Sequence, residues 1–420
     1  MTQPHRVHVV GAGLAGLAAA LTLAEAGVGV VLHEAAPQAG GRCRSYFDAG
    51  LGCRIDNGNH LLLAGNRAAM HYLRDIGARP SLTGPDEAVF PFLDRGTGER
   101  WTLRPNAGKL PWWVLSPRRR VKGTGLLDYL PARRLADAPA EAAVNQALDP
   151  RALIFRRLWQ PLAVAALNTE VEAASARLFG AVLNETLGAG GSACLPLLPR
   201  EGLSESLVDP ALAKLALRGV ELRLGSRLRA MAFSEDRLAS LDFEGSLEPL
   251  SAEEAAVLAV PAPIAARLVP DLTAPDEFRA IVNAHFRVAL HGDAPWFVGI
   301  IGGVAEWVFR KPDVLSVTVS AADRLIDAAA EELAPLLWRD VAAAYDLPAD
   351  PLPPWQIVKE KRATFAATPA QLERRPGAAT RWANLVLAGD WIDTGLPATI
   401  EGALRSGFAA AERLLGRAAS

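Results

Sequence analysis

The sequence predicts an α/β protein built around a parallel strand–helix–strand unit. Two observations support this prediction. Near the N-terminus, a short apolar strand at 7–10, a glycine turn, a helix at 14–26 and a second strand ending at Glu34 follow one another. Near the C-terminus, an apolar strand runs into Gly389 and Asp390, and a Pro-containing turn and a helix follow. The segments between these ends are long enough for a second, α+β domain.

Three glycines shape the N-terminal turn. Gly11, Gly13 and Gly16 form the pattern G-x-G-x-x-G. Gly11 permits a tight turn, Gly13 leaves room for a pyrophosphate to approach the backbone, and Gly16 lets the helix pack on the strand. The helix N-terminus offers free N–H groups to the phosphates. Glu34 lies where an acid receives a ribose hydroxyl, so the pattern predicts a Rossmann-like dinucleotide-binding domain.

Composition excludes several other classes. The chain has 420 residues, 50% hydrophobic and 21% charged, which is typical of a globular protein with two domains. Its formal net charge of -2 provides no polyanion-binding field, so we expect no nucleic-acid partner. Cys43, Cys53 and Cys194 form neither a CxxC pair nor an even disulfide set. We therefore expect reduced thiols in a cytoplasm and no metal site. Glu25 and Gly27 interrupt the apolar run 14–32, so we also expect no membrane-spanning helix.

A second glycine turn follows the ribose acid. The stretch EAAPQAGGRCRS (34–45) places Gly40, Gly41 and Arg42 there, and a plain nicotinamide-binding domain has no need for them. The stretch resembles the flavoprotein fold that amine oxidases and carotenoid desaturases share. In that fold the glycine pair lets the chain pass beside the pyrophosphate, and the arginine helps to hold it. The alternative is an ordinary surface turn with an exposed arginine.

The C-terminal stretch LAGDWIDTGLPATIEGALRSG (387–407) adds to this resemblance. The resemblance implies that Gly389 and Asp390 contact the ribityl and phosphate region of FAD. It also directs the backbone of Thr399 and Ile400, at a helix N-terminus, toward the flavin ring, where a reduced flavin carries negative charge. We expect noncovalent FAD, because no cysteine follows Cys194 to form a thioether.

The middle of the chain supplies further strands. The stretches 219–233 and 255–261 are predicted as strands of the same nucleotide domain, and the resemblance places the adenine near Leu228. The two domains are therefore interleaved. The FAD-binding domain is expected at 1–66, 202–268 and 376–420, and the substrate domain at 67–201 and 269–375.

Four stretches narrow the resemblance. They are IDNGNHLLL (55–63), LWQPLAVAALNTEVEAASARLF (158–179), VKEKRATFAATP (358–369) and the C-terminal stretch. Together they resemble the hydroxysqualene dehydroxylase family, desaturase-like FAD enzymes of hopanoid-producing bacteria. The resemblance implies reductive removal of an allylic hydroxyl from a C30 isoprenoid to give squalene. The sequence shows no second glycine-rich βαβ motif, so we expect the electrons to come from an outside donor that the sequence does not identify.

The reaction needs a proton donor near the departing hydroxyl. His60, in the GNH turn of IDNGNHLLL, is our candidate, because the family geometry puts this turn near the flavin. The alternative is a histidine with a purely structural role.

The substrate is nearly insoluble in water, which draws attention to the region Trp112–Lys122. Trp112, Trp113, Val114 and Leu115 stand beside Arg118, Arg119, Arg120 and Lys122, a composition that suits an anionic bilayer surface. The alternative is that the tryptophans are core and the arginines a solvated face. The expected location is cytoplasmic, with a peripheral position on the inner face of the membrane as an option.

Three rival interpretations stay open. An amine oxidase commonly has a Tyr two residues before the Glu-Gly-Ala of the C-terminal helix, and here that position is Thr399. A carotenoid or phytoene desaturase would run the flavin in the oxidative direction. A prenyl-lipid carrier of the same fold would have no catalysis, although the glycines, Glu34, Arg42 and Asp390 argue against it.

Overall fold

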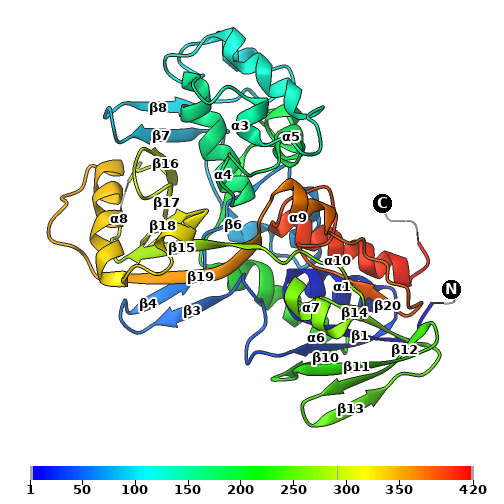
Figure 1. The fold of residues 1–420 in the computed structure, drawn as a ribbon. Coiled ribbons are helices and arrows are strands. Elements are labelled where there is room, and N and C mark those ends of the chain that lie inside the picture. Colours follow the sequence, from blue (N-terminus) through cyan, green and yellow to red (C-terminus); the bar gives the residue numbers. More distant parts are fainter. Residues whose placement is uncertain (1–2, 291, 418–420) are drawn as a thin grey trace.

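A parallel sheet joins segments from the whole length of the chain. The computed structural model describes residues 3–290 and 292–417. The sheet has the strand order β10-β2-β1-β14-β20, and all its pairs are parallel. Its strands are β1 (Arg6–Val10), β2 (Gly29–Glu34), β10 (Glu221–Leu224), β14 (Glu254–Leu258) and β20 (Leu385–Leu387). Strands from the N-terminal and C-terminal parts of the sequence, β1 and β20, consequently lie in one sheet (Figure 1).

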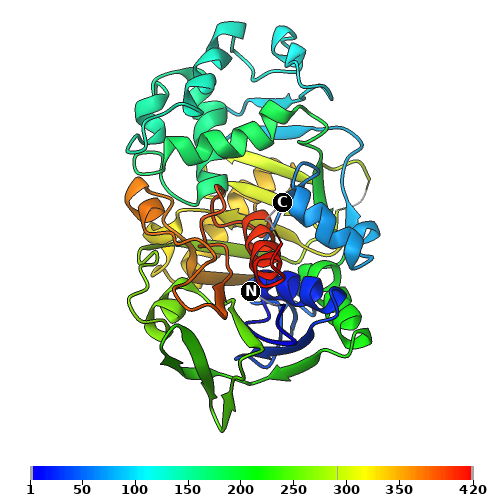
Figure 2. The same cartoon turned by 90° about the vertical axis from the view of Figure 1, so that its right-hand side faces the viewer.

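Two helices from opposite ends of the sequence pack beside this sheet. They are α1 (Leu14–Glu25) and α10 (Ile400–Leu414). Their approach is close, because a Cβ at Gly407 would lie 2.2 Å from the carbonyl oxygen of Ala15. Figure 2 shows α10 in red directly above α1 in blue. The C-terminal helix thus completes the N-terminal βαβ unit, as the sequence predicts.

The predicted strand at 219–233 divides between two sheets. Residues 221–224 form β10 of the parallel sheet, whereas β11 (Leu228–Ser234) pairs with β12 (Arg237–Phe243) and then β13 (Ser246–Pro249) in a separate antiparallel sheet. Gly225, with φ +68°, makes the turn between β10 and β11. The stretch at 255–261 supplies β14 of the parallel sheet as expected.

A seven-stranded mixed sheet forms the second layer. Its order is β19-β15-β18-β17-β16-β7-β8. The strands are β7 (Phe90–Asp94), β8 (Arg100–Leu103), β15 (Phe278–Phe286), β16 (Phe297–Ile301), β17 (Trp307–Arg310), β18 (Leu315–Val319) and β19 (Trp355–Phe365). Helix α8 (Ala330–Ala344) packs on one face of this sheet, where Leu337 and Trp338 meet Val317. The other face packs with helical segments, as Trp307 and Phe155 share one apolar core.

The remaining elements connect these layers. The helices are α2 (Arg67–Asp75), α3 (Val144–Ala147), α4 (Gln160–Leu167), α5 (Ala176–Glu185), α6 (Asp209–Leu217), α7 (Ala262–Leu268) and α9 (Pro369–Glu373). The short strands are β3 (Ser45–Asp48), β4 (Cys53–Asp56), β5 (Leu62–Leu63), β6 (Leu82–Thr83) and β9 (Pro196–Pro199). Within the described residues, the structure contains no helix with the length and apolar character needed to cross a membrane.

The tryptophan pair near residue 112 has one buried and one exposed member. Trp113 and Val114 are buried, whereas Trp112 is 55% exposed and Leu115 is 58% exposed. The core alternative is therefore correct for Trp113, whereas binding of a membrane surface by the exposed residues stays a prediction. Trp113 belongs to the core, and Trp112 faces outward.

A buried histidine pair under the parallel sheet makes stability depend on pH. His8 Nδ1 and His33 Nε2 lie 3.2 Å apart, and His33 Nδ1 lies 3.0 Å from Ser226 Oγ. Burial lowers the pKa of both rings, that of His33 to about 3 from 6.5. At a pH between these two pKa values, His33 is protonated in the unfolded chain and neutral in the folded chain. The contribution of His33 is therefore complete above pH 6.5 and is lost as the pH falls toward 3.

We expect acidification to lower the free energy of unfolding, with His33 contributing up to about 1.4 kcal/mol per pH unit. Replacing His33 by Gln should remove this contribution of up to about 1.4 kcal/mol per pH unit from the slope of the free energy of unfolding against pH. The slope is measured by urea unfolding at several pH values between about 5 and 7.5. The control is His5→Gln, because the side chain of His5 is 59% exposed. Equal slopes in the two variants would contradict this prediction.

Candidate active site

The first glycine turn leaves an open space at a helix N-terminus. Gly11 has φ +109°, and a Cβ there would lie 2.3 Å from the carbonyl oxygen of Ala259. A Cβ at Gly16 would lie 1.8 Å from the Gly11 oxygen. Packing therefore requires both glycines. A Cβ at Gly13, in contrast, would have no atom within 4 Å, so an anion can approach the backbone at the start of α1.

Glu34 lies beside this turn at the end of β2. Its Oε2 accepts a hydrogen bond from the N–H of Ala12 at 2.8 Å, and Oε1 accepts one from Ala36 at 2.9 Å. The N–H of Ser226 donates to the Glu34 carbonyl oxygen at 2.8 Å, two residues before the buried Leu228. The structure thus brings the expected ribose acid and the expected adenine contact to the same end of the parallel sheet.

The second glycine turn lies against the first. The N–H of Gly40 donates to the carbonyl oxygen of Ala12 at 2.8 Å. Gly40 has φ +105° and Gly41 has φ +57°. A Cβ at Gly41 would lie 3.5 Å from the Cα of Gly13, so both turns border the same open space. This arrangement is a backbone cradle, rather than an ordinary surface turn.

Arg42 and Asp390 join the two ends of the sequence in an ion pair. Arg42 Nη2 lies 2.7 Å from Asp390 Oδ1, and Nη1 donates to the carbonyl oxygen of Ala363. The Asp390 charge raises the pKa of Arg42 despite burial. Gly389, with φ +147°, turns the chain from β20 into this contact. Two residues 348 positions apart therefore meet at the cradle.

The N-terminus of α10 follows the loop 391–399 that begins directly after Asp390. Thr399 caps it, since its Oγ1 accepts a hydrogen bond from Gly402 at 3.0 Å, and Ile400 is the first helical residue. Thr394 Oγ1 is buried and has no partner within the described chain. It lies near the same helix start, because a Cβ at Gly402 would be 3.4 Å from both hydroxyls. Thr394 belongs to the C-terminal stretch 387–407, but no pattern in that stretch indicates a role for its hydroxyl.

The residues of this cradle fit an anionic dinucleotide. A Cβ at Gly13 would have no protein atom within 4 Å, and one at Gly41 would be near the Gly13 Cα only. The helix N-terminus supplies N–H donors, and Arg42 supplies positive charge. The unpartnered Thr394 hydroxyl offers one more hydrogen bond. These features suit the pyrophosphate of a dinucleotide and the polar groups attached to it.

His60 lines a small cavity next to the end of β17 in the mixed sheet. The cavity has about 10 Å³ of free space, enough for about one water molecule. Its lining residues are Asp56, Asn59, His60, Leu198, Pro199, Leu203, Phe309, Arg310 and Lys311. Burial lowers the pKa of His60 to about 4, so the ring is neutral at pH 7. Asn59 Oδ1 is buried and has no hydrogen-bond partner among the described residues, which leaves an acceptor at this cavity.

A buried ion pair forms one wall of the cavity. Lys311 Nζ bonds Asp56 Oδ2, while Asp56 Oδ1 accepts hydrogen bonds from Ser45 at 2.5 Å and Leu203 at 2.9 Å. Burial alone would raise the pKa of Asp56, but the Lys311 ammonium and these hydrogen bonds hold it below its usual value. Lys311 could not be predicted from the sequence, because it lies 255 positions from Asp56 and in no motif.

Removing the lysine should leave an uncompensated buried charge. We expect Lys311→Met to lower the free energy of unfolding by about 3–5 kcal/mol at pH 7, because Asp56 is 3% exposed. Adding Asp56→Asn to that variant should recover much of the loss. Lys361→Met is the control, since that side chain is 72% exposed and should change stability by less than about 0.5 kcal/mol. If urea unfolding shows that Lys311→Met loses no more stability than the control, this prediction is refuted.

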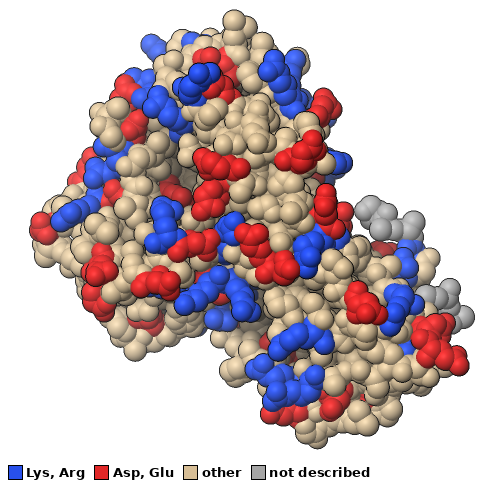
Figure 3. All heavy atoms as spheres, in the orientation of Figure 1, with Lys and Arg blue, Asp and Glu red and all other residues tan. Residues whose placement is uncertain are grey.

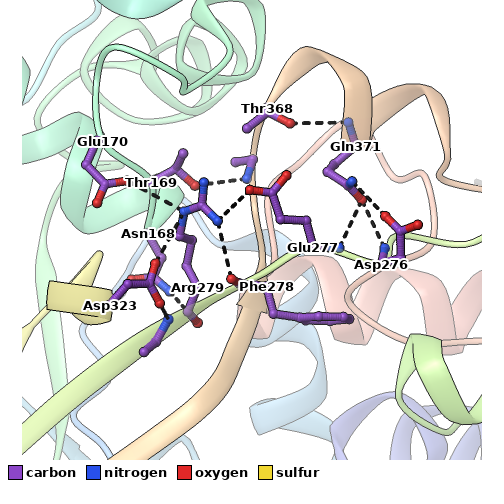
Figure 4. Close-up of polar contacts among 12 residues, drawn as sticks. Asn168, Thr169, Glu170, Asp276, Glu277, Phe278, Arg279, Asp323, Thr368 and Gln371 are labelled. Atoms are coloured by element: carbon purple, nitrogen blue, oxygen red, sulfur yellow. Dashed lines mark hydrogen bonds and ion pairs between the residues drawn. The ribbon is translucent and has the colours of Figure 1, made fainter. Parts of the chain in front are cut away.

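Part of the stretch 158–179 forms a polar joint between helix and sheet (Figure 4). Asn168, in the left-handed conformation after α4, donates to Thr364 Oγ1 at 2.9 Å. Arg279 of β15 lies 2.7 Å from Glu277 and 3.6 Å from Glu170. These contacts fix α4 against the long strands β15 and β19, so this part of the stretch has a structural role.

The two glycine turns and the C-terminal strand and helix that close on them define a class of flavin-dependent oxidoreductases. The chain belongs to the family of flavin-containing amine oxidoreductases, whose family model matches residues 14–415. The flavin expected from the second glycine turn is therefore confirmed at the level of the family. The carrier alternative is not supported, because the chain is an oxidoreductase of this family.

Within this family the chain groups with the hydroxysqualene dehydroxylases. It is 52% identical over 415 residues to the hydroxysqualene dehydroxylase of Rhodopseudomonas palustris, covering 98% of this chain and 99% of the relative. The enzyme of the same name from Sinorhizobium fredii is 48% identical over 412 residues, with the same coverage. The resemblance inferred from the four sequence stretches is confirmed.

Solved structures support the fold. A putrescine oxidase bound to putrescine has a TM-score of 0.72 and 17% identity, covering 99% of this chain and all of that chain. Cyclohexylamine oxidase from Brevibacterium oxydans also has a TM-score of 0.72, with 16% identity, covering 98% of this chain and 99% of that chain. At these identities the likeness concerns the fold alone.

Proposed function

We propose that the chain binds FAD noncovalently across the two glycine turns. The phosphates would lie at Gly11, Gly13 and Gly16, with Gly40, Gly41 and Arg42 on the other side of them. Glu34 would bind the adenosine ribose, Leu228 would contact the adenine, and Gly389 and Asp390 would contact the ribityl arm. The start of α10 at Thr399 and Ile400 would stabilise negative charge on the ring system. The open space at Gly13 supports this arrangement.

We propose hydroxysqualene as the substrate and squalene as the product. One observation carries this proposal: the match to the named dehydroxylase covers 98% of this chain and 99% of the relative. It therefore includes both domains rather than the nucleotide motifs alone. By our interpretation the FAD-binding domain comprises 1–66, 202–268 and 376–420, and the substrate domain comprises 67–201 and 269–375.

The reaction requires a proton and a hydride. The allylic C–O bond breaks, the hydroxyl leaves as water with one proton, and the carbon receives one hydride. Reduced flavin, when bound, supplies this hydride, and its reducing equivalents come from a donor outside the chain. The protein must keep water from the allylic cation, and the apolar residues Leu198, Pro199 and Phe309 would serve this purpose at the cavity.

His60 would contact the departing hydroxyl. Its ring is neutral at pH 7 because burial holds the pKa near 4, so alone it donates a hydrogen bond rather than a full proton. A negative charge brought into the cavity would raise this pKa and make the ring a better acid. We propose His60 as the group that binds and protonates the hydroxyl in the loaded, reduced enzyme.

We also propose that the chain works at the inner surface of a membrane. Substrate and product are both water-insoluble, and the region Trp112–Lys122 exposes Trp112 and Leu115 beside basic residues.

Two measurements test the proposed function. Heat or acid should release unmodified FAD from the purified protein, as identified by mass spectrometry, and flavin that stays attached would refute noncovalent binding. The reduced holoprotein should convert hydroxysqualene to squalene, whereas the oxidised holoprotein should leave a primary amine unchanged.

A carotenoid-type desaturase is the second candidate. The chain is 29% identical over 252 residues to a protein of Synechococcus elongatus named "Probable zeta-carotene desaturase", covering 55% of this chain and 52% of that relative. Oxidation of phytoene by the oxidised holoprotein, without turnover of hydroxysqualene, would favour this candidate.

A further inference from the structure

The segment 104–134 holds half of the strongly exposed large apolar side chains in the described part of the chain. Twelve such side chains are exposed, and six of them lie in or beside two 3₁₀ helices, η2 (Trp112–Leu115) and η3 (Leu126–Leu135). These six are Leu110, Trp112, Leu115, Leu126, Leu127 and Leu130. The cyan-to-teal segment lies at the end of the molecule opposite the parallel sheet (Figures 1 and 2).

Inward-facing aromatic rings hold the two 3₁₀ helices together. The rings of Trp113 and Tyr129 meet edge to face at 5.1 Å between centroids, and Tyr129 meets Trp159 in the same way at 6.1 Å. The Tyr129 hydroxyl also accepts a hydrogen bond from the N–H of Val121 at 3.0 Å. Because the aromatic anchors point inward, Leu127 and its five exposed companions lie on a fixed outer surface.

Positive charge is concentrated on the same segment. Residues 104–134 contain eight Lys or Arg and one acidic residue, Asp128, a formal charge of +7 (eight minus one) in a chain of -2. Lys122 pairs with Glu99 at 3.0 Å, and the other seven basic groups have no ion pair within the described residues. Figure 3 shows several Lys and Arg side chains, with some acidic ones among them, around the upper end of the molecule.

Three of these unpaired groups share a surface recess. Arg104, Arg118 and Arg119, with Thr102, line a hollow of about 430 Å³. The N–H of Arg104 donates to the carbonyl oxygen of Arg119 at 2.8 Å, which holds the two stretches side by side. Planar guanidinium groups bind phosphate oxygens in pairs, so this recess suits a phosphate monoanion.

We propose that residues 104–134 form a docking surface for an anionic phospholipid bilayer. The six apolar side chains enter the boundary between headgroups and acyl chains, and the arginine recess receives lipid phosphate. This extends the surface beyond Trp112–Lys122 to η3 and Arg104, and it rests on the proposed function only for its purpose, the delivery of a C30 lipid. A purely apolar partner would leave seven basic groups unmatched, whereas an anionic bilayer matches both features.

Vesicle cosedimentation of the holoprotein tests the proposal. We expect binding to phosphatidylcholine vesicles that contain phosphatidylglycerol, weaker binding to pure phosphatidylcholine, and no competition from millimolar inorganic phosphate. Leu127→Ser/Leu130→Ser should release the protein from both vesicle types. Arg118→Gln/Arg119→Gln should lower binding to the anionic vesicles alone, by about fivefold for each arginine. The controls are Leu217→Ser, 88% exposed on α6, and Arg267→Gln on α7.

The proposal fails if wild-type holoprotein stays in the supernatant with anionic vesicles, or if the patch variants bind as well as the controls. Competition by inorganic phosphate would assign the recess to a free anion instead of a lipid. The turnover of detergent-dispersed hydroxysqualene should be the same in all variants. A protein that binds vesicles but never converts the substrate would refute the proposed function and leave the docking surface standing.

Discussion

Replacing Gly13 by Val should give a folded protein that does not retain flavin. A Cβ at Gly13 would have no protein atom within 4 Å, and its φ of -76° suits any residue, so the side chain costs the fold little. It would, however, fill the space that the pyrophosphate needs at the start of α1. We expect loss of the yellow colour and of nearly all bound flavin, measured by absorbance, with unchanged circular dichroism.

Two variants control for the site and for the fold. Gly377→Val places the same side chain at an exposed loop position that is equally free of contacts, and it should keep its flavin. Gly16→Val should damage the fold itself, because a Cβ there would lie 1.8 Å from the Gly11 oxygen. Full flavin occupancy in Gly13→Val would show that the dinucleotide does not cross this turn.

Replacing His60 by Ala should slow turnover of bound substrate by about 10²–10⁴-fold. Flavin content and the rate of flavin reduction should stay the same, because no cradle residue is altered. The measurement is a single turnover of the reduced holoprotein, which separates the reaction step from substrate binding.

His60→Gln distinguishes the two roles that a histidine can have here. Gln keeps a hydrogen-bond donor but cannot transfer a proton, so it should be as slow as Ala if His60 protonates the hydroxyl. Since burial holds the pKa of His60 near 4 in the flavin-free protein, the free ring should stay neutral from pH 5 upward. Turnover in His60→Ala equal to that of the wild type would remove His60 from the mechanism.

The parts of the site that the sequence predicts are local. Gly11, Gly40 and Gly41 have positive φ values that only glycine adopts readily, and the packing at Gly16 leaves no room for a Cβ. The glycine pattern in the sequence therefore predicts both turns. The meeting of Arg42 with Asp390 could be expected only through resemblance, because no local rule links positions 348 apart.

Other features depend on packing between distant segments, which local sequence patterns do not indicate. Trp112 and Trp113 are adjacent and chemically identical, yet only the second meets Tyr129 and becomes core. Lys311 stands beside Asp56 because β17 and β18 bring their turn against β4, and nothing in either stretch indicates this. The turn at Gly225 divides one predicted strand into β10 and β11, which belong to two different sheets.

The most direct measurement follows the flavin and the lipid together. The purified holoprotein is photoreduced without oxygen, hydroxysqualene is added, and flavin absorbance and extracted lipid are recorded over time. We expect the flavin to reoxidise with one squalene formed for each flavin. A flavin that stays reduced in a folded protein, with hydroxysqualene recovered unchanged, would contradict the dehydroxylase function.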